Sequence, residues 1–118
     1  RDIDIMTLSE DVLDNASYFG RIFARCGGLA DAVAQGLKEH GIEDFDLRAC
    51  SCDGIEACRA ALLRKSKGML DANFIEGMAC IGGAGCLTHG EKNKKEVDKY
   101  GMQAHEKTIS DAISILNK

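Results

Sequence analysis

A short segment over residues 74–86, FIEGMACIGGAGC, constrains this chain more than any other part of its sequence. An apolar approach leads into Cys80 and Cys86, which are separated by Ile81, Ala84 and three glycines. Glycine permits positive φ and close approach of the backbone to a bulky group, and thiolate is the soft ligand that iron–sulfur clusters require. The pattern therefore favours a metal or cluster site. The alternative is a tight turn between a buried strand and a helix, with two thiols that only fill space.

The composition is that of one soluble globular domain spanning residues 1–118. Of the 118 residues, 45% are hydrophobic and 29% are charged, which is enough for one ordinary core. The net charge of −4 argues against nucleic acid as a partner, because binding phosphates requires a concentrated basic face. No apolar run approaches the roughly 20 residues that span a bilayer, and the charged first residues are unlike a secretion signal. We therefore expect neither membrane insertion nor secretion.

The chain contains six cysteines, and two explanations are open. They form either a disulfide framework in a secreted domain or reduced thiols that serve metal and redox chemistry. Disulfide scaffolds compensate for a thin core, whereas this chain has abundant Leu, Ile, Ala and Val at helical spacing. We therefore expect reduced thiols and a cytoplasmic location.

The hydrophobic pattern predicts an α/β structure, in which helices cover a small sheet. Helices are expected over residues 28–40 and 55–67, each followed by a glycine, and from about residue 92 to the end with a break near Gly101. In the second helix we expect the side chains of Ile55, Cys58, Ala61 and Leu62 to face inward.

Two strands are expected between these helices. Residues 42–52 alternate at Phe45, Leu47 and Ala49, and residues 73–78 lead into the cysteine–glycine segment. The first residues are expected to form an incoming strand or arm. Because functional loops of α/β proteins lie at strand ends, the cysteine–glycine segment is placed as such a loop.

Three segments resemble the iron-iron (iron-only) hydrogenases. FIEGMAC, with its following glycines and cysteine, is similar to the last signature of that family, in which E-x-M-A-C is followed by three residues and a second cysteine. SYFGRIFARCGGLADAV resembles an earlier segment of the family, in which a Phe/Tyr-Gly approach leads to a paired-glycine helix start, and CDGIEACRAALL resembles a segment of its monomeric and sensory-type members. The resemblance extends over about residues 2–118 and implies the C-terminal part of the catalytic domain of the large subunit.

This resemblance also implies a cofactor and its ligands. The family carries a 4Fe-4S cluster joined through a cysteine sulfur to a two-iron subsite. By resemblance, Cys80 would bind the cluster, Cys86 is the candidate bridging ligand, and Met78 would lie against the two-iron subsite, with Gly82 and Gly83 completing the cofactor-binding segment. The implied activity is reversible reduction of protons to hydrogen, or hydrogen sensing, in a cytoplasmic redox protein of an anaerobe.

Two departures from the family pattern limit what the resemblance implies. Five residues, rather than three, separate Cys80 from Cys86, and this proline-free chain lacks the two earlier proline-containing motifs. We therefore expect the cofactor to be absent or incomplete here and the chain alone to be inactive. The implied partners are the N-terminal remainder of the catalytic domain and a ferredoxin-like electron carrier. The alternative is a cofactor-free regulatory or interaction module derived from the same fold.

The remaining candidate residues are three cysteines in a C-x-C-x5-C pattern, Cys50, Cys52 and Cys58, and the isolated Cys26. With His89, the three cysteines would suit zinc, but strand alternation predicts that at least one of them points away, so simple packing is favoured. Cys26 is expected to be structural or to line a pocket.

Glu76 and the histidines complete the candidates. Glu76 either flanks the cluster or forms an ion pair, and the sequence leaves this open. His89 is expected to cap a helix or face solvent rather than bind metal, and His40 and His105 are expected at the surface.

Overall fold

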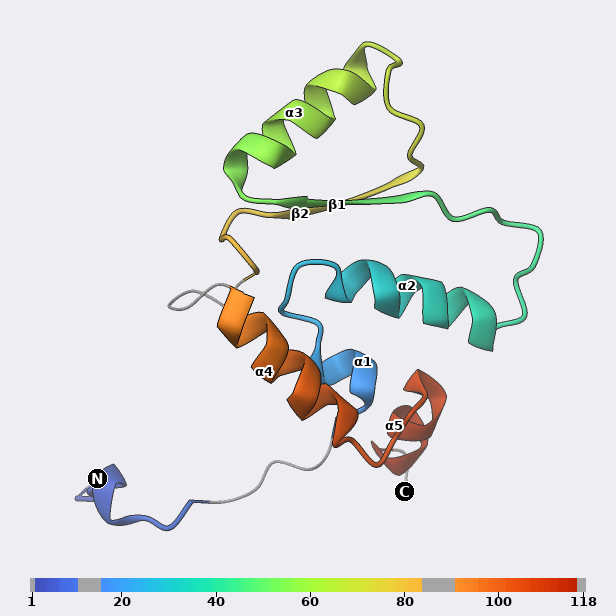
Figure 1. The fold of residues 1–118 in the computed structure, drawn as a ribbon. Helices are drawn as coiled ribbons and strands as arrows, with labels where there is room; N and C mark the ends of the chain where they lie inside the picture. Colours follow the sequence, from blue (N-terminus) through green and yellow to red (C-terminus); the bar gives the residue numbers. More distant parts are fainter. Residues whose placement is uncertain (1, 11–15, 84–90, 117–118) are drawn as a thin grey trace.

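The computed structural model describes residues 2–10, 16–83 and 91–116. Its upper half in Figure 1 is a layered α/β unit, with a parallel sheet of two strands in the described residues. The strands are β1 (Ala49–Asp53) and β2 (Phe74–Met78), which pair with Cys52 opposite Gly77. Helix α3 (Ile55–Ser66) packs on one face of this sheet and α2 (Gly28–Glu39) on the other. The predicted α/β class is confirmed.

The lower half of the molecule in Figure 1 is helical. Its elements are α1 (Tyr18–Arg21), α4 (Glu91–Met102) and α5 (Ile109–Leu116). Helix α1 contacts both α2 and α4, and α5 packs against α2. Where α1 meets α4, an added Cβ at Gly101 would lie only 2.6 Å from Cγ2 of Ile22, which is fully buried. Close contact between α1 and α4 therefore depends on this glycine.

The helix ends follow the sequence pattern closely. Gly27, before α2, has a φ of 90°, and Gly41 and Gly68, which follow α2 and α3, have φ values of 66° and 68°. These are left-handed conformations that glycine adopts without strain. The predicted helices over residues 28–40 and 55–67, and the strand at residues 73–78, are confirmed to within a residue or two.

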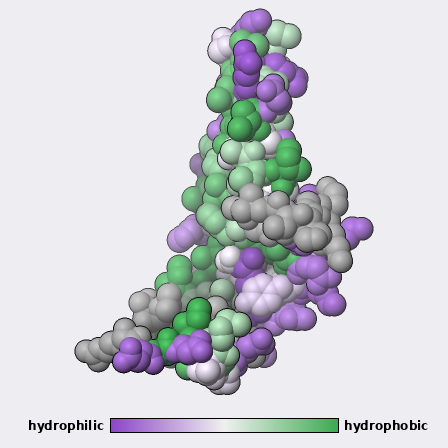
Figure 2. All heavy atoms as spheres, turned by 90° about the vertical axis from the view of Figure 1, so that its left-hand side faces the viewer, coloured by the Kyte–Doolittle hydropathy of each residue, from purple (hydrophilic) through white to green (hydrophobic). Residues whose placement is uncertain are grey.

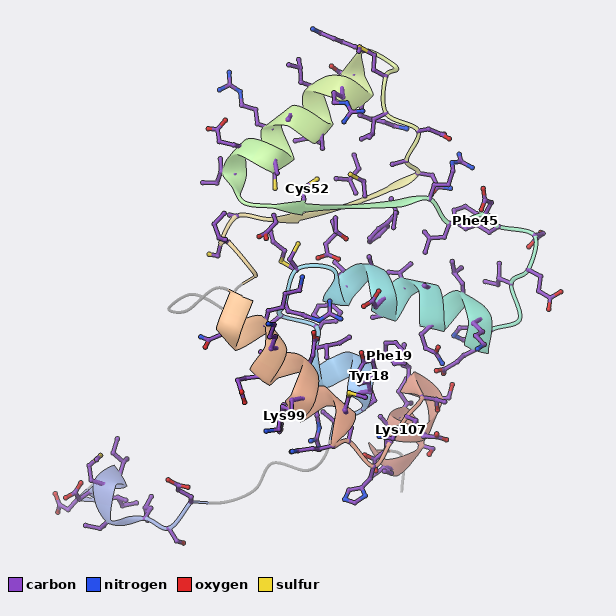
Figure 3. The ribbon with its side chains drawn as sticks, in the orientation of Figure 1. Tyr18, Phe19, Phe45, Cys52, Lys99 and Lys107 are labelled. Carbon is purple, nitrogen blue, oxygen red and sulfur yellow. The ribbon has the colours of Figure 1, made fainter. Side chains whose placement is uncertain are left out.

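Two expectations about local structure were wrong. Strand β1 begins at Ala49 rather than near residue 42, and Phe45 lies outside the sheet with 49% of its surface exposed (Figure 3). Just before the strand, the N–H of Arg48 donates to the side-chain oxygen of Asn73 at 2.7 Å, in place of a backbone carbonyl, and the Arg48 carbonyl accepts from the N–H of Asn73 at 3.0 Å. At the start of the chain, residues 2–10 form an exposed arm with a short 3-10 turn, η1 (Ile5–Thr7), which is one of the two forms expected for this segment.

The second error concerns the inward face of α3. Cys58 and Ala61 do face the sheet, but Ile55 and Leu62 are 67% and 60% exposed. Neighbouring strands lie only about 5 Å apart, so a pair of strands covers a narrow stripe of a helix. The side chains on either side of that stripe stay at the surface.

No helix within the described ranges is long and apolar enough to cross a membrane.

Candidate functional site

The predicted cysteine–glycine loop lies at the carboxyl ends of the two strands. After β2 the chain turns at Cys80, whose carbonyl accepts a hydrogen bond from the N–H of Gly83 at 2.8 Å. The end of β1 holds this turn, because the N–H of Gly82 donates to Oδ1 of Asp53 at 2.6 Å and the N–H of Gly54 donates to the carbonyl of Met78 at 2.8 Å. Both strand ends thus fix the position of the turn.

The segment before α2 also reaches the turn. The N–H of Cys26 donates to the carbonyl of Gly82 at 2.9 Å, although the two residues are far apart in the sequence. Cys26 is 8% exposed, and its burial, together with the nearby charges of Asp53 and Glu76, raises the pKa of its thiol. These conditions favour the neutral thiol, which agrees with the expected structural or pocket-lining role.

Glycine is required in the turn for a reason that the structure makes plain. Gly82 and Gly83 have φ values of 81° and 95°. A Cβ on Gly83 would lie 2.3 Å from the carbonyl oxygen of Ala24 and 2.7 Å from Cα of Arg25. Gly83 therefore allows two backbone segments to touch, and the space next to it is filled by protein.

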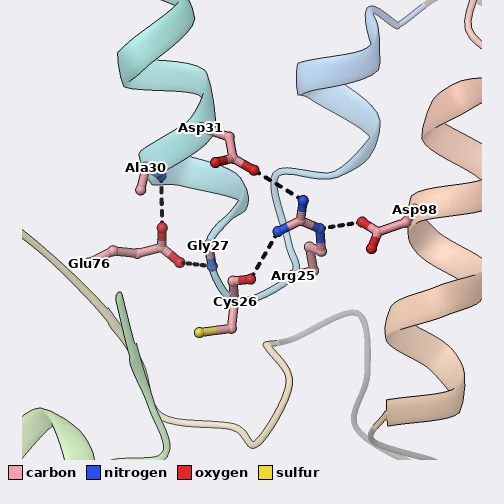
Figure 4. Close-up of polar contacts among 7 residues, drawn as sticks. All are labelled: Arg25, Cys26, Gly27, Ala30, Asp31, Glu76 and Asp98. Carbon is pink, nitrogen blue, oxygen red and sulfur yellow. Dashed lines mark hydrogen bonds and ion pairs between the residues drawn. The ribbon is translucent and has the colours of Figure 1, made fainter. Parts of the chain in front are cut away.

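Glu76 connects the sheet to α2. Its side chain is 1% exposed, and its two carboxylate oxygens accept hydrogen bonds from the N–H of Gly27 at 2.6 Å and from the N–H of Ala30 at 2.7 Å (Figure 4). Helix α2 begins at a glycine and has no side-chain cap of its own, so Glu76 caps it from β2. The negative charge also suits the positive end of the helix dipole.

Arg25 joins the segment before α2 to helix α4. Its guanidinium pairs with Asp98 of α4, with Asp31 of α2 at 3.0 Å, and with the carbonyl of Cys26 at 3.0 Å (Figure 4). Burial disfavours the charge, but the hydrogen bonds and attraction from Asp98 and Asp31 outweigh burial, and the pKa of Arg25 is raised. The loop that meets the cysteine turn is thereby fixed to two helices.

The comparison with protein families decides the relationship. The family model described as iron only hydrogenase large subunit, C-terminal domain, matches residues 1–90. This chain belongs to that family. A search among curated proteins finds no match. The matched region of the hydrogenase family contains β1, α3, β2 and the Cys80 turn, whereas α4 and α5 lie after it.

Membership in the iron-only hydrogenase family relates the chain to iron–sulfur oxidoreductases, whose full-length hydrogenases carry iron–sulfur cofactors. Of the predicted cofactor-binding residues, Met78 ends β2 and is half-buried, Cys80 is half-buried in the turn, and Gly82 and Gly83 are buried behind it. Cys86 and His89 lie outside the described residues. The hydrogenase assignment of these side chains as ligands stays a prediction.

The described part of this hydrogenase-family chain offers fewer ligands than a cluster needs. A 4Fe-4S cluster is held by four cysteine thiolates. Within residues 2–10, 16–83 and 91–116, no three His, Cys, Asp or Glu side chains converge so that they could hold a metal ion. The described residues therefore offer Cys80 as a single thiol and do not by themselves fit a complete cluster.

In this hydrogenase-family chain, the side chains of Cys50, Cys52 and Cys58 lie where the sheet meets α3. Strand alternation was expected to separate them, but Cys50 and Cys52 are two residues apart in β1 and so share a face, with their Sγ atoms 3.9 Å apart. The Sγ of Cys58, from α3, lies 3.8 Å from the carbonyl oxygen of Cys52. The expectation that one thiol points away was wrong.

The sequence missed several residues that position the site in this hydrogenase-family chain. Asp53 could have been found, because it is the polar residue at the end of a strand beside the predicted loop. The capping role of Glu76 and the pairing of Arg25 with Asp98 gave no local signal, since the partners are 46 to 73 residues away.

Proposed function

We propose that this chain is part of the catalytic domain of an iron-iron hydrogenase-like redox protein that reduces protons reversibly to hydrogen or senses hydrogen. In this proposal, Cys80 supplies one thiolate to a 4Fe-4S cluster, and cysteines beyond the described residues supply the others. One observation carries the proposal. Within the region matched by the hydrogenase family, Cys80 lies half-buried at the carboxyl ends of both strands, where functional loops of α/β proteins gather.

The roles of the surrounding residues follow from their contacts. Asp53 and the N–H of Cys26 hold the two polar backbone groups of Gly82, and Glu76 fixes the segment that carries Cys26. These contacts would keep the Cys80 thiolate in place while its cluster changes oxidation state. The bound cluster would supply electron transfer, and the chain alone is expected to be inactive because its sequence lacks the two earlier family motifs.

The surface supports a large polypeptide partner, which we propose is the N-terminal remainder of the catalytic domain. The exposed area is 8726 Å², whereas a compact monomer of this length exposes roughly 6,200 Å². Apolar side chains lie at the surface of the narrow upper half of the molecule (Figure 2), and on α3 they include Ile55, Leu62 and Leu63. We also propose a ferredoxin-like electron carrier and a cytoplasmic location, which suits the free cysteines of the described residues.

A cofactor-free regulatory or interaction module is the second candidate function. Two observations favour it. The spacing of Cys80 and Cys86 departs from the family signature, and Gly83 brings the turn against the backbone of Ala24 and Arg25 rather than opening a cavity.

Anaerobic reconstitution with iron and sulfide of this chain together with the N-terminal remainder of the catalytic domain, which supplies the other ligands in the proposal, separates these two functions. The chain is compared with Cys80→Ser and with the control Cys58→Ser, and iron, sulfide and zinc per chain are measured together with the EPR spectrum of the reduced sample. Ligation by Cys80 predicts that iron, sulfide and the cubane signal are lost in Cys80→Ser and kept in Cys58→Ser. Equal iron content in the chain and in Cys80→Ser would remove Cys80 as a ligand and favour the cofactor-free module.

A further inference from the structure

Cys50 and Cys52 form a close pair of thiols whose placement follows from the register of the sheet. In parallel pairing, Ser51 lies opposite Glu76, which faces α2, so the side chains of Cys50 and Cys52 face α3. Figure 3 shows Cys52 on that side of the sheet. Their Sγ atoms are 3.9 Å apart. Cys50 is half-buried, whereas Cys52 is 3% exposed. The pair therefore has one thiol that solvent can reach and one that is enclosed.

The third nearby thiol, that of Cys58, contacts backbone carbonyls rather than another thiol. Gly77, opposite Cys52, leaves room for Cys58 of α3, since a Cβ at Gly77 would lie 3.4 Å from the Cys58 Sγ. The Cys58 thiol is 3.8 Å from the carbonyl oxygens of both Cys52 and Met78, to which it donates. In the described residues these thiols do not make a three-ligand metal site. The geometry thus favours a reaction between Cys50 and Cys52.

We propose that Cys50 and Cys52 are a redox-active dithiol that exchanges with small-molecule disulfides. The Cys50 thiolate attacks one sulfur of the disulfide RSSR, forming a Cys50–SR bond and releasing RS⁻. The Cys52 thiolate then attacks Sγ of Cys50, which forms the Cys50–Cys52 bond and releases a second RS⁻. The two protons from Cys50 and Cys52 end on two molecules of RSH. The protein loses two electrons and RSSR gains them.

The backbone indicates that this disulfide is easily reduced. Two residues of an extended strand span roughly 6.4 to 6.8 Å between their Cα atoms, and their parallel side chains keep the Cβ atoms about as far apart, whereas a disulfide needs roughly 3.5 to 4.5 Å between Cβ atoms, so the bond requires β1 to bend at Ser51. The bond therefore forms at the expense of the regular geometry of β1. Strained disulfides have higher reduction potentials and are the labile ones. The pair is suited to reversible exchange rather than to permanent crosslinking.

The second step is expected to limit the rate at neutral pH. Burial first, and then the hydrogen bond with Cys50, raises the pKa of Cys52 to about 11, and the thiols of Cys58 and Cys26 add to this effect. Only a small fraction of Cys52 is thiolate at neutral pH, so ring closure becomes faster as the pH rises toward that value. Cys50 exchanges first, because solvent reaches it.

The test uses the whole reduced chain under anaerobic conditions, with oxidised glutathione as the probe. After incubation, remaining thiols are blocked with N-ethylmaleimide. Trypsin then cleaves after Arg48 and after Arg59 and releases residues 49–59, which contain all three cysteines. Mass spectrometry then reads this peptide in the native chain and in the variants Cys50→Ser, Cys52→Ser and Cys58→Ser. Circular dichroism confirms that each variant is folded.

The proposal predicts a different peptide for each protein. The native peptide loses two hydrogen atoms and carries one maleimide, and Cys58→Ser loses two hydrogen atoms and carries none. Cys52→Ser retains glutathione on Cys50, and Cys50→Ser forms no disulfide. Reduced glutathione should restore the native peptide. The proposal is overturned if Cys58→Ser forms no disulfide, since the pair would then include Cys58, or if the native peptide stays fully reduced.

Discussion

Glu76 is the residue that links the cysteine turn, the sheet and α2, and its charge is central to that role. Both of its oxygens accept backbone hydrogen bonds in a buried place. In Glu76→Gln, the amide nitrogen would face one of the two N–H groups, leaving it unsatisfied. We expect the free energy of unfolding to fall by about 2 kcal/mol, as is typical for losing a charge-assisted hydrogen bond in a buried site.

Urea unfolding followed by circular dichroism measures this loss. Glu43→Gln removes the same charge on an exposed segment and should change the free energy of unfolding by less than about 0.5 kcal/mol. If the two variants are equally stable, Glu76 is not the cap that holds α2.

Gly83 allows a second prediction at the scale of a residue. In Gly83→Ala the new Cβ meets the backbone of Ala24 at a φ of 95°, so we expect a loss of at least about 2 kcal/mol in the free energy of unfolding. Gly36, inside α2, has nothing within 4 Å of an added Cβ, and Gly36→Ala should stabilise the chain by about 0.5 to 1 kcal/mol. Opposite signs in thermal unfolding would establish that Gly83 is needed for contact between the two segments. A tolerated Gly83→Ala would contradict the close approach.

At the scale of elements, the attachment of α5 to α2 depends on pH through Glu39. The hydroxyl of Ser110 first, then the amide of Gln35 and the backbone N–H groups of Ile109 and Ser110, lower the pKa of Glu39 to about 2. The folded pKa lies below the unfolded value of about 4.3, so the stabilisation is complete above that value and is lost as pH falls toward 2. We expect the contacts between Glu39 and the start of α5 to weaken in that window.

NMR of the backbone amides of Ile109 and Ser110 measures this effect. Their chemical shifts should change between about pH 4.3 and pH 2 in the native chain. In Glu39→Gln they should stay constant over the same range. Equal titration curves in both proteins would show that another group controls the contact.

At the scale of the whole molecule, the chain is more extended than its length requires. Its radius of gyration is 17.3 Å, against about 13.5 Å for a compact domain of 118 residues. Exposed Leu62 and Leu63 on α3 therefore contribute little to folding and are available to a partner. Replacing both with serine should lower binding of a hydrophobic dye but change the free energy of unfolding by less than about 1 kcal/mol. A large loss of stability would mean that these leucines belong to the core.

The sequence predicted what local chemistry determines and missed what distant contacts determine. The ends of α2 and α3 were predictable because a glycine at the end of an apolar repeat is a local signal. The position of the cysteine turn at the strand ends followed from the order of the elements. The inward face of α3 was wrong at Ile55 and Leu62, because periodicity does not reveal how wide the covered surface is. The thiols of Cys50 and Cys52 were misplaced because alternation was applied to residues two positions apart.

The two carboxylates that cap helices from a distance have a consequence for how the molecule opens and closes. Glu76 of β2 holds the first amides of α2, and Glu39 of α2 holds the first amides of α5. Neither helix start is complete until another element has arrived. Hydrogen exchange at Ala30 and Ser110 should therefore follow the separation of whole elements rather than the fraying of single helices, and α5 should lose its protection whenever α2 does.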